Sequence, residues 1–197
     1  MNSVARPDGN TTGVNFLSLE TDGKRQDILI EAVPGLRRMA ALADVNSEPQ
    51  LDAMQDAARA HNVELSIFHI AKGDEIAPAI DNAHASGATA INVLSSLLFY
   101  THRQLIIDRV AALHLPTIYE FPETAEEGGF AGYGPRLSAL NEAMARQIVQ
   151  VLRGTKIADI PVQQPTKFEL VINLKTAKAM GVTVPEALLV RADKVIE

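Results

Sequence analysis

The sequence predicts an α/β fold built on a doubly wound parallel sheet. Between residues 38 and 119, apolar runs of strand length alternate with amphipathic segments of helix length, a pattern typical of βαβ units. Only 5% of the 197 residues are aromatic and Trp is absent, so Ala, Val, Ile and Leu must form most of the core. Right-handed crossovers between parallel strands then place helices on both faces of the sheet.

The individual elements follow from the spacing of apolar residues and from the turn residues between them. A short apolar run at 13–17 fits either a strand or a crossover segment. Strands are predicted at 38–42, 63–70, 88–94 and 116–119. Helices are predicted at 23–33, 49–62, 75–85 and 99–113.

The pattern changes after Tyr119. An acidic loop at 120–129 leads into a short strand at 130–133, and a strongly amphipathic helix at 137–152 follows. An extended connector with two prolines covers 157–164. Alternating residues at 168–172 predict another strand, after which Asn173 caps a helix that ends at Gly181, and a short helix begins near Pro185.

Composition excludes several classes of protein. The net charge of -6 and the scattered basic residues argue against nucleic-acid binding, which needs clustered Lys and Arg. The absence of Cys excludes disulfides, thiolate zinc sites and a Cys nucleophile. None of the five histidines is spaced as a metal-binding pair, so no metal site is expected. No apolar run approaches the roughly 20 residues of a membrane-spanning helix.

Ligands of open parallel sheets bind at the carboxyl ends of the strands. This rule selects four loops, at 44–48, 71–74, 95–99 and 120–123. In the first, Asn46 and Ser47 fit either a polar ligand clamp or a cap for the helix that follows. In the third, Ser95 and Ser96 could hydrogen-bond a solute beside the ring of Phe99, or could cap a helix above a core aromatic residue.

No catalytic residue or cofactor is expected. A Ser nucleophile would need neighbouring glycines and a His partner, and Gly is missing on both sides of the Ser95-Ser96 pair. The acidic run that begins at Glu120 fits a solvated loop better than general acid–base chemistry. The segment 9–13 has neither the lysine nor the spacing of a phosphate-binding loop.

Several segments resemble one family in the same order and spacing. They read ARPDGNTTGVNFLS at 5–18, AVPGLRRMAAL at 32–42, HLPTIYEF at 114–121, GGFAGYG at 128–134 and VLRGTKIADIPVQQPTKFELVINLKTAKAMG at 151–181. Together they resemble the substrate-binding proteins of ABC importers for aromatic amino acids and related small organic solutes. That family has the periplasmic binding protein type 1-like fold.

The resemblance implies a protein of two α/β lobes that traps its solute by closing like a clamshell. On this template, residues 14–116 and 165–197 form the C-terminal lobe. Residues 117–164 form the crossover and a remnant of the N-terminal lobe, including the helix at 137–152. The strands of the N-terminal lobe are expected to be missing, so that the chain is an N-terminally truncated member of the family.

The resemblance also implies a non-catalytic role in capturing a small, amino acid-like solute, without a cofactor. The expected ligand-binding residues are Asn46, Ser47, Ser95, Ser96, Phe99, Tyr119, Phe121 and Tyr133. Relatives that bind aromatic amino acids often carry Asp-Asn where this chain has Ser96-Leu97, and that Asp pairs with the ammonium group of the ligand. This difference leaves the identity of the solute open.

Partners and compartment follow in the same way. The resemblance implies docking on an ABC permease and a periplasmic location, reached through a signal peptide. The polar N-terminus has no apolar signal core, so a chain that began here would stay in the cytoplasm. Without its lobe, the helix at 137–152 would expose an apolar face, which predicts a homodimer. The residues of that face are Leu137, Leu140, Met144, Ile148 and Leu152.

Two alternatives remain at this point. One is a flavodoxin-like α/β enzyme that uses the Ser95-Ser96 loop together with Asp44. The other is a stand-alone ligand-sensing module that keeps the fold without taking part in transport.

Overall fold

The computed structural model describes residues 7, 10–16, 18–45 and 47–197, and it contains two compact units. Of these described residues, those within 19–134 and 169–197 form the sheet unit, and those up to 18 together with 135–168 form the helix unit. The lobe boundaries expected from the family template, 14–116 with 165–197 for one lobe and 117–164 for the remainder, stay a prediction. Among the described residues, no helix is long and apolar enough to cross a membrane.

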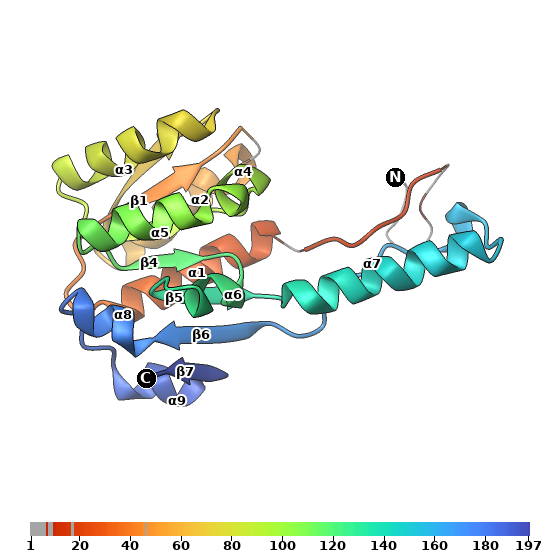
Figure 1. The fold of residues 1–197 in the computed structure, drawn as a ribbon. Coiled ribbons are helices and arrows are strands. Elements are labelled where there is room, and N and C mark those ends of the chain that lie inside the picture. Colours follow the sequence, from red (N-terminus) through yellow and green to blue (C-terminus); the bar gives the residue numbers. More distant parts are fainter. Residues whose placement is uncertain (1–6, 8–9, 17, 46) are drawn as a thin grey trace. The chain divides into compact units, whose positions relative to one another are not determined.

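The sheet unit is built on a seven-stranded sheet of order β2-β1-β3-β4-β5-β6-β7 (Figure 1). All neighbouring strands are parallel except β5 and β6, which run antiparallel. The strands are β1 Arg38–Ala43, β2 Glu64–His69, β3 Ile91–Val93, β4 Thr117–Tyr119, β5 Ala131–Gly134, β6 Glu169–Asn173 and β7 Lys194–Ile196. The predicted α/β class with a doubly wound, mainly parallel sheet is confirmed.

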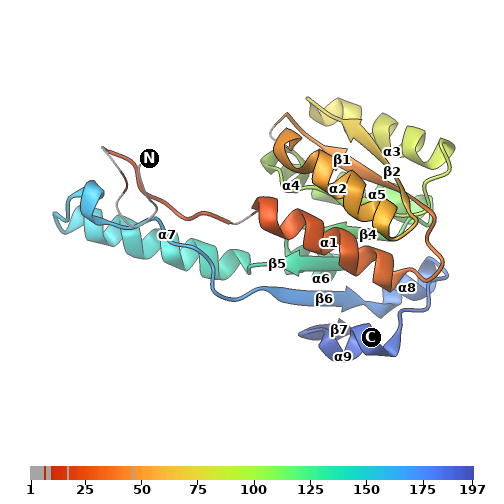
Figure 2. The ribbon, with the colours of Figure 1, turned by 180° about the vertical axis from the view of Figure 1, so that it is seen from behind.

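Helices cover both faces of this sheet. The helices of the sheet unit are α1 Ser18–Ala32, α2 Glu48–Ala60, α3 Ile76–Ala85, α4 Leu97–Thr101, α5 Arg103–Ala112, α6 Pro122–Glu126, α8 Leu174–Ala179 and α9 Glu186–Arg191, with a 3-10 turn, η1 Gly73–Glu75. Helices α3 and α5 lie on one face (Figure 1), and α1 and α2 lie on the other (Figure 2).

Side-chain alternation along β1 explains the two layers. Ala40 and Leu42 pack into the cluster that holds the apolar residues of α3 and α5. Met39 packs with α1, and Ala41 packs with α2. Because β1 is buried on both faces, it reads as a continuous apolar run rather than as an alternating one.

Several features of the sheet unit differ from the sequence prediction. The single helix expected at 99–113 is divided at His102, whose backbone leaves helical geometry between α4 and α5. The acidic loop contains α6, which begins with Pro122 at its first turn and buries Thr124 and Ala125. Strand β7 was not predicted, because three residues are too few for a recognisable alternation.

The predicted junction between β6 and α8 is confirmed. Asn173 Oδ1 accepts a hydrogen bond from Thr176 N at 3.1 Å and so caps α8. The Asn173 side-chain amide also donates to the carbonyl oxygen of Ala125 at 3.0 Å, and the Thr176 hydroxyl donates to that of Gly128 at 2.9 Å. The same cap therefore joins α8 to the segment around α6.

The helix unit consists of α7 Leu137–Leu152, a 3-10 turn, η2 Ile157–Asp159, and extended segments packed beside the helix. The buried Gln147 side chain donates to the carbonyl oxygens of Gly13 at 3.0 Å and Pro161 at 3.1 Å. Val14 forms an isolated bridge with Gln163, which matches the strand-or-crossover prediction for that run. The bounds predicted for α7 agree with those of the structure.

Candidate functional site

The strand order creates one position where the connections diverge. From β1 the chain continues to β2 on one side, whereas β3 pairs with β1 on the other side. At such a switch point the loops at the carboxyl ends of the strands separate and leave a crevice that suits a ligand. We call the described residues of the loops after β1, β3 and β4, namely 44–45, 47, 94–96 and 120–121, the strand-end site.

Asp44 joins the first two of these loops. The Ser96 hydroxyl donates to Asp44 Oδ2 at 2.5 Å, and the Ser47 hydroxyl donates to Asp44 Oδ1 at 3.3 Å. Ser96 Oγ also accepts a hydrogen bond from Leu98 N at 3.1 Å and so caps α4. The sequence left open whether Ser96 caps a helix or binds a ligand. In the structure Ser96 caps α4, and it lies at the switch point of the sheet.

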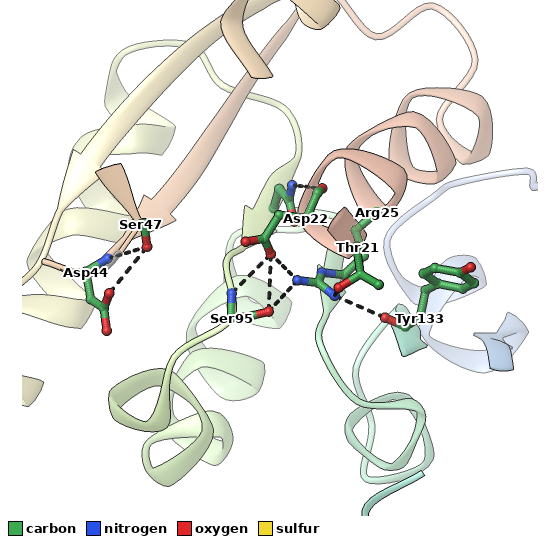
Figure 3. Close-up of polar contacts among 8 residues, drawn as sticks. Thr21, Asp22, Arg25, Asp44, Ser47, Ser95 and Tyr133 are labelled. Carbon is green, nitrogen blue, oxygen red and sulfur yellow. Dashed lines mark hydrogen bonds and ion pairs between the residues drawn. The ribbon is translucent and has the colours of Figure 1, made fainter. Parts of the chain in front are cut away.

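A buried ion pair contacts Ser95 of the second loop (Figure 3). Asp22 and Arg25 of α1 are both fully buried and are bonded to each other. Arg25 also donates to Ser95 Oγ at 2.6 Å, to Thr21 Oγ1 at 3.1 Å and to the carbonyl oxygen of Tyr133 at 3.3 Å. One guanidinium group therefore connects α1, the loop after β3 and the end of β5.

Asp22 completes this network from the other side. Its carboxylate accepts hydrogen bonds from Ser95 N at 3.2 Å and Ser95 Oγ at 3.3 Å. The Asn92 side-chain amide donates to the Asp22 carbonyl oxygen at 3.3 Å. Because a buried charge is stable only when it is paired and hydrogen-bonded, this network fixes the position of Ser95.

Glu120 contributes a third carboxylate, from the loop after β4. Burial raises the pKa of Glu120, and the charge of Arg25 and hydrogen bonds from the Ser95 side chain and the Ser96 backbone partly offset this rise. Glu120 and Ser96, which also contacts Asp44, line the same small recess. Glu120 is only partly exposed.

Aromatic rings border the site next to Glu120. The rings of Tyr100 and Phe121 meet edge to face, with centroids 5.3 Å apart. The guanidinium of Arg103 lies 4.6 Å from the centre of the Tyr100 ring and forms two hydrogen bonds to Glu127, at 2.6 and 3.1 Å. The recess that these residues line holds only about 20 Å³, room for about one water molecule.

A sequence model of the ABC transporter substrate binding protein family matches residues 1–196. The chain belongs to this family. Among curated proteins, it is 24% identical over 185 residues to a tyrosine-binding protein of Clostridioides difficile, and the match covers 90% of the chain and 52% of that relative. The chain thus spans about half the length of this curated relative.

Solved structures agree with the family assignment. An ABC domain from Streptococcus pneumoniae in complex with L-Trp has a TM-score of 0.84 and 26% identity, covering all of this chain and 68% of that chain. A conserved domain protein from Vibrio cholerae has a TM-score of 0.86 and 21% identity, covering 99% of this chain and 66% of that one. At 21% identity, the similarity to the Vibrio cholerae protein shows a shared fold only.

In this member of the family, the sequence-predicted site residues divide into two groups. Ser47, Ser95 and Ser96 meet at the strand-end site, as described above. The side chains of Phe99, Tyr119 and Phe121 are 2%, 3% and 4% exposed, and all three line the small recess beside Ser96 and Glu120. Tyr133 contributes its carbonyl oxygen to Arg25 while its ring packs on the core cluster beside α1, and Asn46 lies outside the described residues.

Three charged residues of the site were not assigned a role from the sequence. Asp22 and Arg25 lie in a segment predicted only in part as a helix, and their partner Ser95 is distant in the chain. Glu120 was interpreted as part of a solvated loop. A charged pair three residues apart on an otherwise buried helix face is the signal that could have identified Asp22 and Arg25.

Proposed function

We propose that this chain captures a small organic, amino acid-like solute at the strand-end site, as the solute-binding component of an ABC importer. Family membership supports the class of function. The observation that carries the location is the convergence of Asp44, Glu120 and Ser96 at the switch point of the sheet. The tyrosine-binding relative and the L-Trp complex support an amino acid-like solute.

Capture by clamshell closure is part of this proposal. A small-molecule site normally buries most of the surface of its ligand, and a recess of about 20 Å³ is far too small for an amino acid. A second surface must therefore close over the strand-end site. Closure of that kind occurs between lobes joined by hinge segments.

The proposed role is non-catalytic. The hydroxyl groups of Ser95 and Ser96 contact carboxylates and a guanidinium, and among the described residues neither is hydrogen-bonded to an imidazole. A Ser nucleophile is activated by an adjacent general base, most often a His. This arrangement favours solute binding over the alternative of an α/β enzyme that uses Ser96 and Asp44.

Thermal-shift and calorimetric titrations against amino acids and small carboxylates test the proposal. A cognate solute at 100 times its Kd is expected to stabilise the protein by about 2.7 kcal/mol, without turnover. Ser96→Ala should weaken the response, whereas Thr101→Ala, which removes an exposed hydroxyl on α4, should retain it. Product formation would support the enzyme instead, and no response to any solute would count against capture.

Docking on an ABC permease and a periplasmic location complete the proposal, and both rest on family membership. Co-purification of the chain with its permease, and its appearance in a periplasmic fraction, are the expected results. Binding to no permease, with solute binding intact, would favour a stand-alone sensing module.

We also propose that two copies associate through the exposed apolar face of α7. Met144, Ile148 and Leu152 are 37%, 59% and 80% exposed and are spaced four residues apart, so they share one side of the helix. Two copies can bury such a face symmetrically. Leu140, which the sequence placed in this surface, is 2% exposed and packs inside the helix unit, so we exclude it from the proposed interface.

Light scattering coupled to size-exclusion chromatography tests the association. The wild-type chain should have the mass of a dimer at high micromolar concentration, and Ile148→Lys should have that of a monomer. A wild-type monomer at that concentration would contradict the proposal.

A further inference from the structure

We infer that Arg103 is a positioning residue, which holds the ring of Tyr100 as a fixed wall beside the strand-end site. The inference rests on the proposed function and assigns the size limit of the same site to a contact outside the strand-end loops. Arg103 acts through the ring of Tyr100 and not by contact with the solute.

All three nitrogen atoms of the Arg103 guanidinium group are engaged. Nε and Nη2 donate to the two carboxylate oxygens of Glu127 at 2.6 and 3.1 Å. Nη1 donates to the carbonyl oxygen of Tyr100 at 3.3 Å. A planar guanidinium with donors in a rigid fork can satisfy this arrangement, and a lysine ammonium cannot reproduce it. The position and the plane of the Arg103 group are therefore fixed.

The Tyr100 ring has a cation over its face and a second ring beside it. The guanidinium carbon of Arg103 lies 4.6 Å from the centre of the Tyr100 ring, within the range of a cation–π contact. The Phe121 ring meets the Tyr100 ring edge to face, with centroids 5.3 Å apart and planes at 82°. Because Tyr100 is only partly buried, these two contacts determine where its ring lies.

The same contacts join the segment after β3 to the segment after β4. Tyr100 lies in α4 and Arg103 begins α5. Phe121 precedes α6 as its N-cap, and Glu127 follows α6 as its C-cap. The corner between α4 and α5 therefore contacts α6 at both of its ends. A movement of the Tyr100 ring away from Phe121 has to disturb its contact with Arg103 as well.

The size of the neighbouring recess shows what the ring excludes. Tyr100, Arg103 and Phe121 line this recess together with Ser96 and Glu120 of the strand-end site. Its volume of about 20 Å³ admits about one water molecule, whereas a cavity that holds benzene measures about 150 Å³. The side chain of a solute can therefore enter on this side only if the Tyr100 ring moves. Because Arg103 opposes that movement, it limits the size of the solute.

Arg109 provides a matched control on the same helix. Its Nε donates to Asp81 Oδ1 at 2.6 Å. The side chains of Arg109 and Asp81 are 41% and 42% exposed, close to the 32% and 38% of Arg103 and Glu127. The described residues that line the recess do not include Arg109. Arg109→Leu therefore removes an ion pair from α5 while leaving the lining of the recess intact.

The NMR signals of the tyrosine rings test the position of Tyr100 directly. The chain has three Tyr and no Trp, so a sample labelled with 13C at tyrosine gives few ring signals, and Tyr100→Phe identifies the one from Tyr100. Arg103→Leu and Glu127→Ala should each move this signal toward the shift of free tyrosine, and Arg109→Leu should leave it unchanged. Arg103→Lys, which keeps the charge without the fork, should give an intermediate shift. An unchanged Tyr100 signal in Arg103→Leu would overturn the inference.

Calorimetric titrations of the full chain with L-alanine, L-phenylalanine and L-tryptophan test the size limit. The ratios of the three Kd values measure how strongly the protein discriminates by the size of the side chain. Arg103→Leu should reduce that discrimination about two- to fivefold, which corresponds to one exposed cation–π contact, and Arg109→Leu should retain it. Ratios that are the same in Arg103→Leu and in the wild type would overturn the inference while leaving solute capture intact.

Failure of the proposed function gives a different result. If none of these amino acids nor any solute of a broad panel binds the wild-type chain, solute capture fails, and the size limit fails with it. The NMR comparison still decides whether Arg103 holds the ring, because it needs no solute. Unfolding curves for each variant verify that the compared proteins are folded.

Discussion

The Ser96 hydroxyl lies 2.5 Å from Asp44 Oδ2 and joins the loop after β3 to the loop after β1. Among the described parallel strands, the chain order reverses only at β1, where β2 lies on one side and β3 on the other. The two loops lie at this reversal. A serine that caps α4 with the same oxygen thereby fixes both sides of the proposed binding site. The stability of this region and its affinity for a solute should consequently depend on the same few polar contacts.

Ser96→Ala should destabilise the protein by about 1–2 kcal/mol. The substitution removes the cap of α4 and leaves Asp44 without one of its donors. Urea denaturation followed by circular dichroism measures the change. Thr101→Ala, which also loses a hydroxyl on α4 but at an exposed position, should cost less than about 0.5 kcal/mol. Equal effects of the two variants would refute the role given to Ser96.

Arg25→Met should be much more destabilising, by about 3–5 kcal/mol, because it leaves the Asp22 carboxylate buried without its counter-charge. The double variant Asp22→Leu/Arg25→Met should recover part of this loss, because neither charge then remains buried. A double-mutant cycle on the free energy of unfolding measures the coupling. Simple additivity of the two single changes would show that the pair does not act as a unit.

Glu120 should make the stability of the protein decrease as the pH rises. Its pKa is raised in the folded state, so between the unfolded and folded values the native protein binds more protons than the unfolded chain. Ionising the buried Glu120 carboxyl therefore costs no stability at a pH below its pKa in the unfolded chain. The full cost is present at a pH above its pKa in the folded protein. Arg25 and the hydrogen bonds from Ser95 and Ser96 oppose this cost, and Asp22 adds to it.

Glu120→Gln consequently should raise the Tm at neutral pH and have little effect in acid, where both side chains are neutral. Thermal unfolding across the pH range above and below the ordinary carboxyl pKa checks this expectation. Such a result would identify Glu120 as a residue whose buried charge lowers the stability of the folded protein at neutral pH. A lower Tm of Glu120→Gln at neutral pH would show that ionised Glu120 stabilises the protein, contrary to this prediction.

Two glycine substitutions should have opposite effects. A Cβ at Gly134 would overlap the carbonyl oxygen of Glu120, which is backbone and cannot move aside, so Gly134→Ala should destabilise the protein by about 1–3 kcal/mol. Gly23 lies inside α1 with no atom near the position of its Cβ, so Gly23→Ala should stabilise by about 0.5–1 kcal/mol. Chemical denaturation of both variants measures whether the free energy of unfolding falls for Gly134→Ala and rises for Gly23→Ala.

Local patterns in the sequence predicted most of the fold. The amphipathic spacing of residues 137–152 defined α7, and Asn173 with Gly181 defined the boundaries of α8, because caps and periodicity are encoded locally. Helix α6 was missed because its buried residues, Thr124 and Ala125, lie among acidic ones that suggested a solvated loop.

The candidate site was less predictable than the fold. The loops could be chosen because strand ends are visible in the sequence, and Ser95 and Ser96 lie where that rule placed them. The partners of these serines could not be chosen, because Asp22 and Glu120 reach the dipeptide only through the order of the strands. Charged residues that pair across a long stretch of chain produce no periodic pattern in a single sequence.

Strands β5 and β6 pair antiparallel, with Gly134 directly opposite Glu169. The chain therefore leaves the sheet after Gly134 and re-enters it at the residue paired with Gly134. Residues 135–168 thus form the loop of a long β-hairpin. Everything they carry, α7 included, is a topological insertion. A tight turn that joined Gly134 to Glu169 would retain every strand of the sheet, and the fold could lengthen, shorten or exchange this insertion without disturbing the order of its strands.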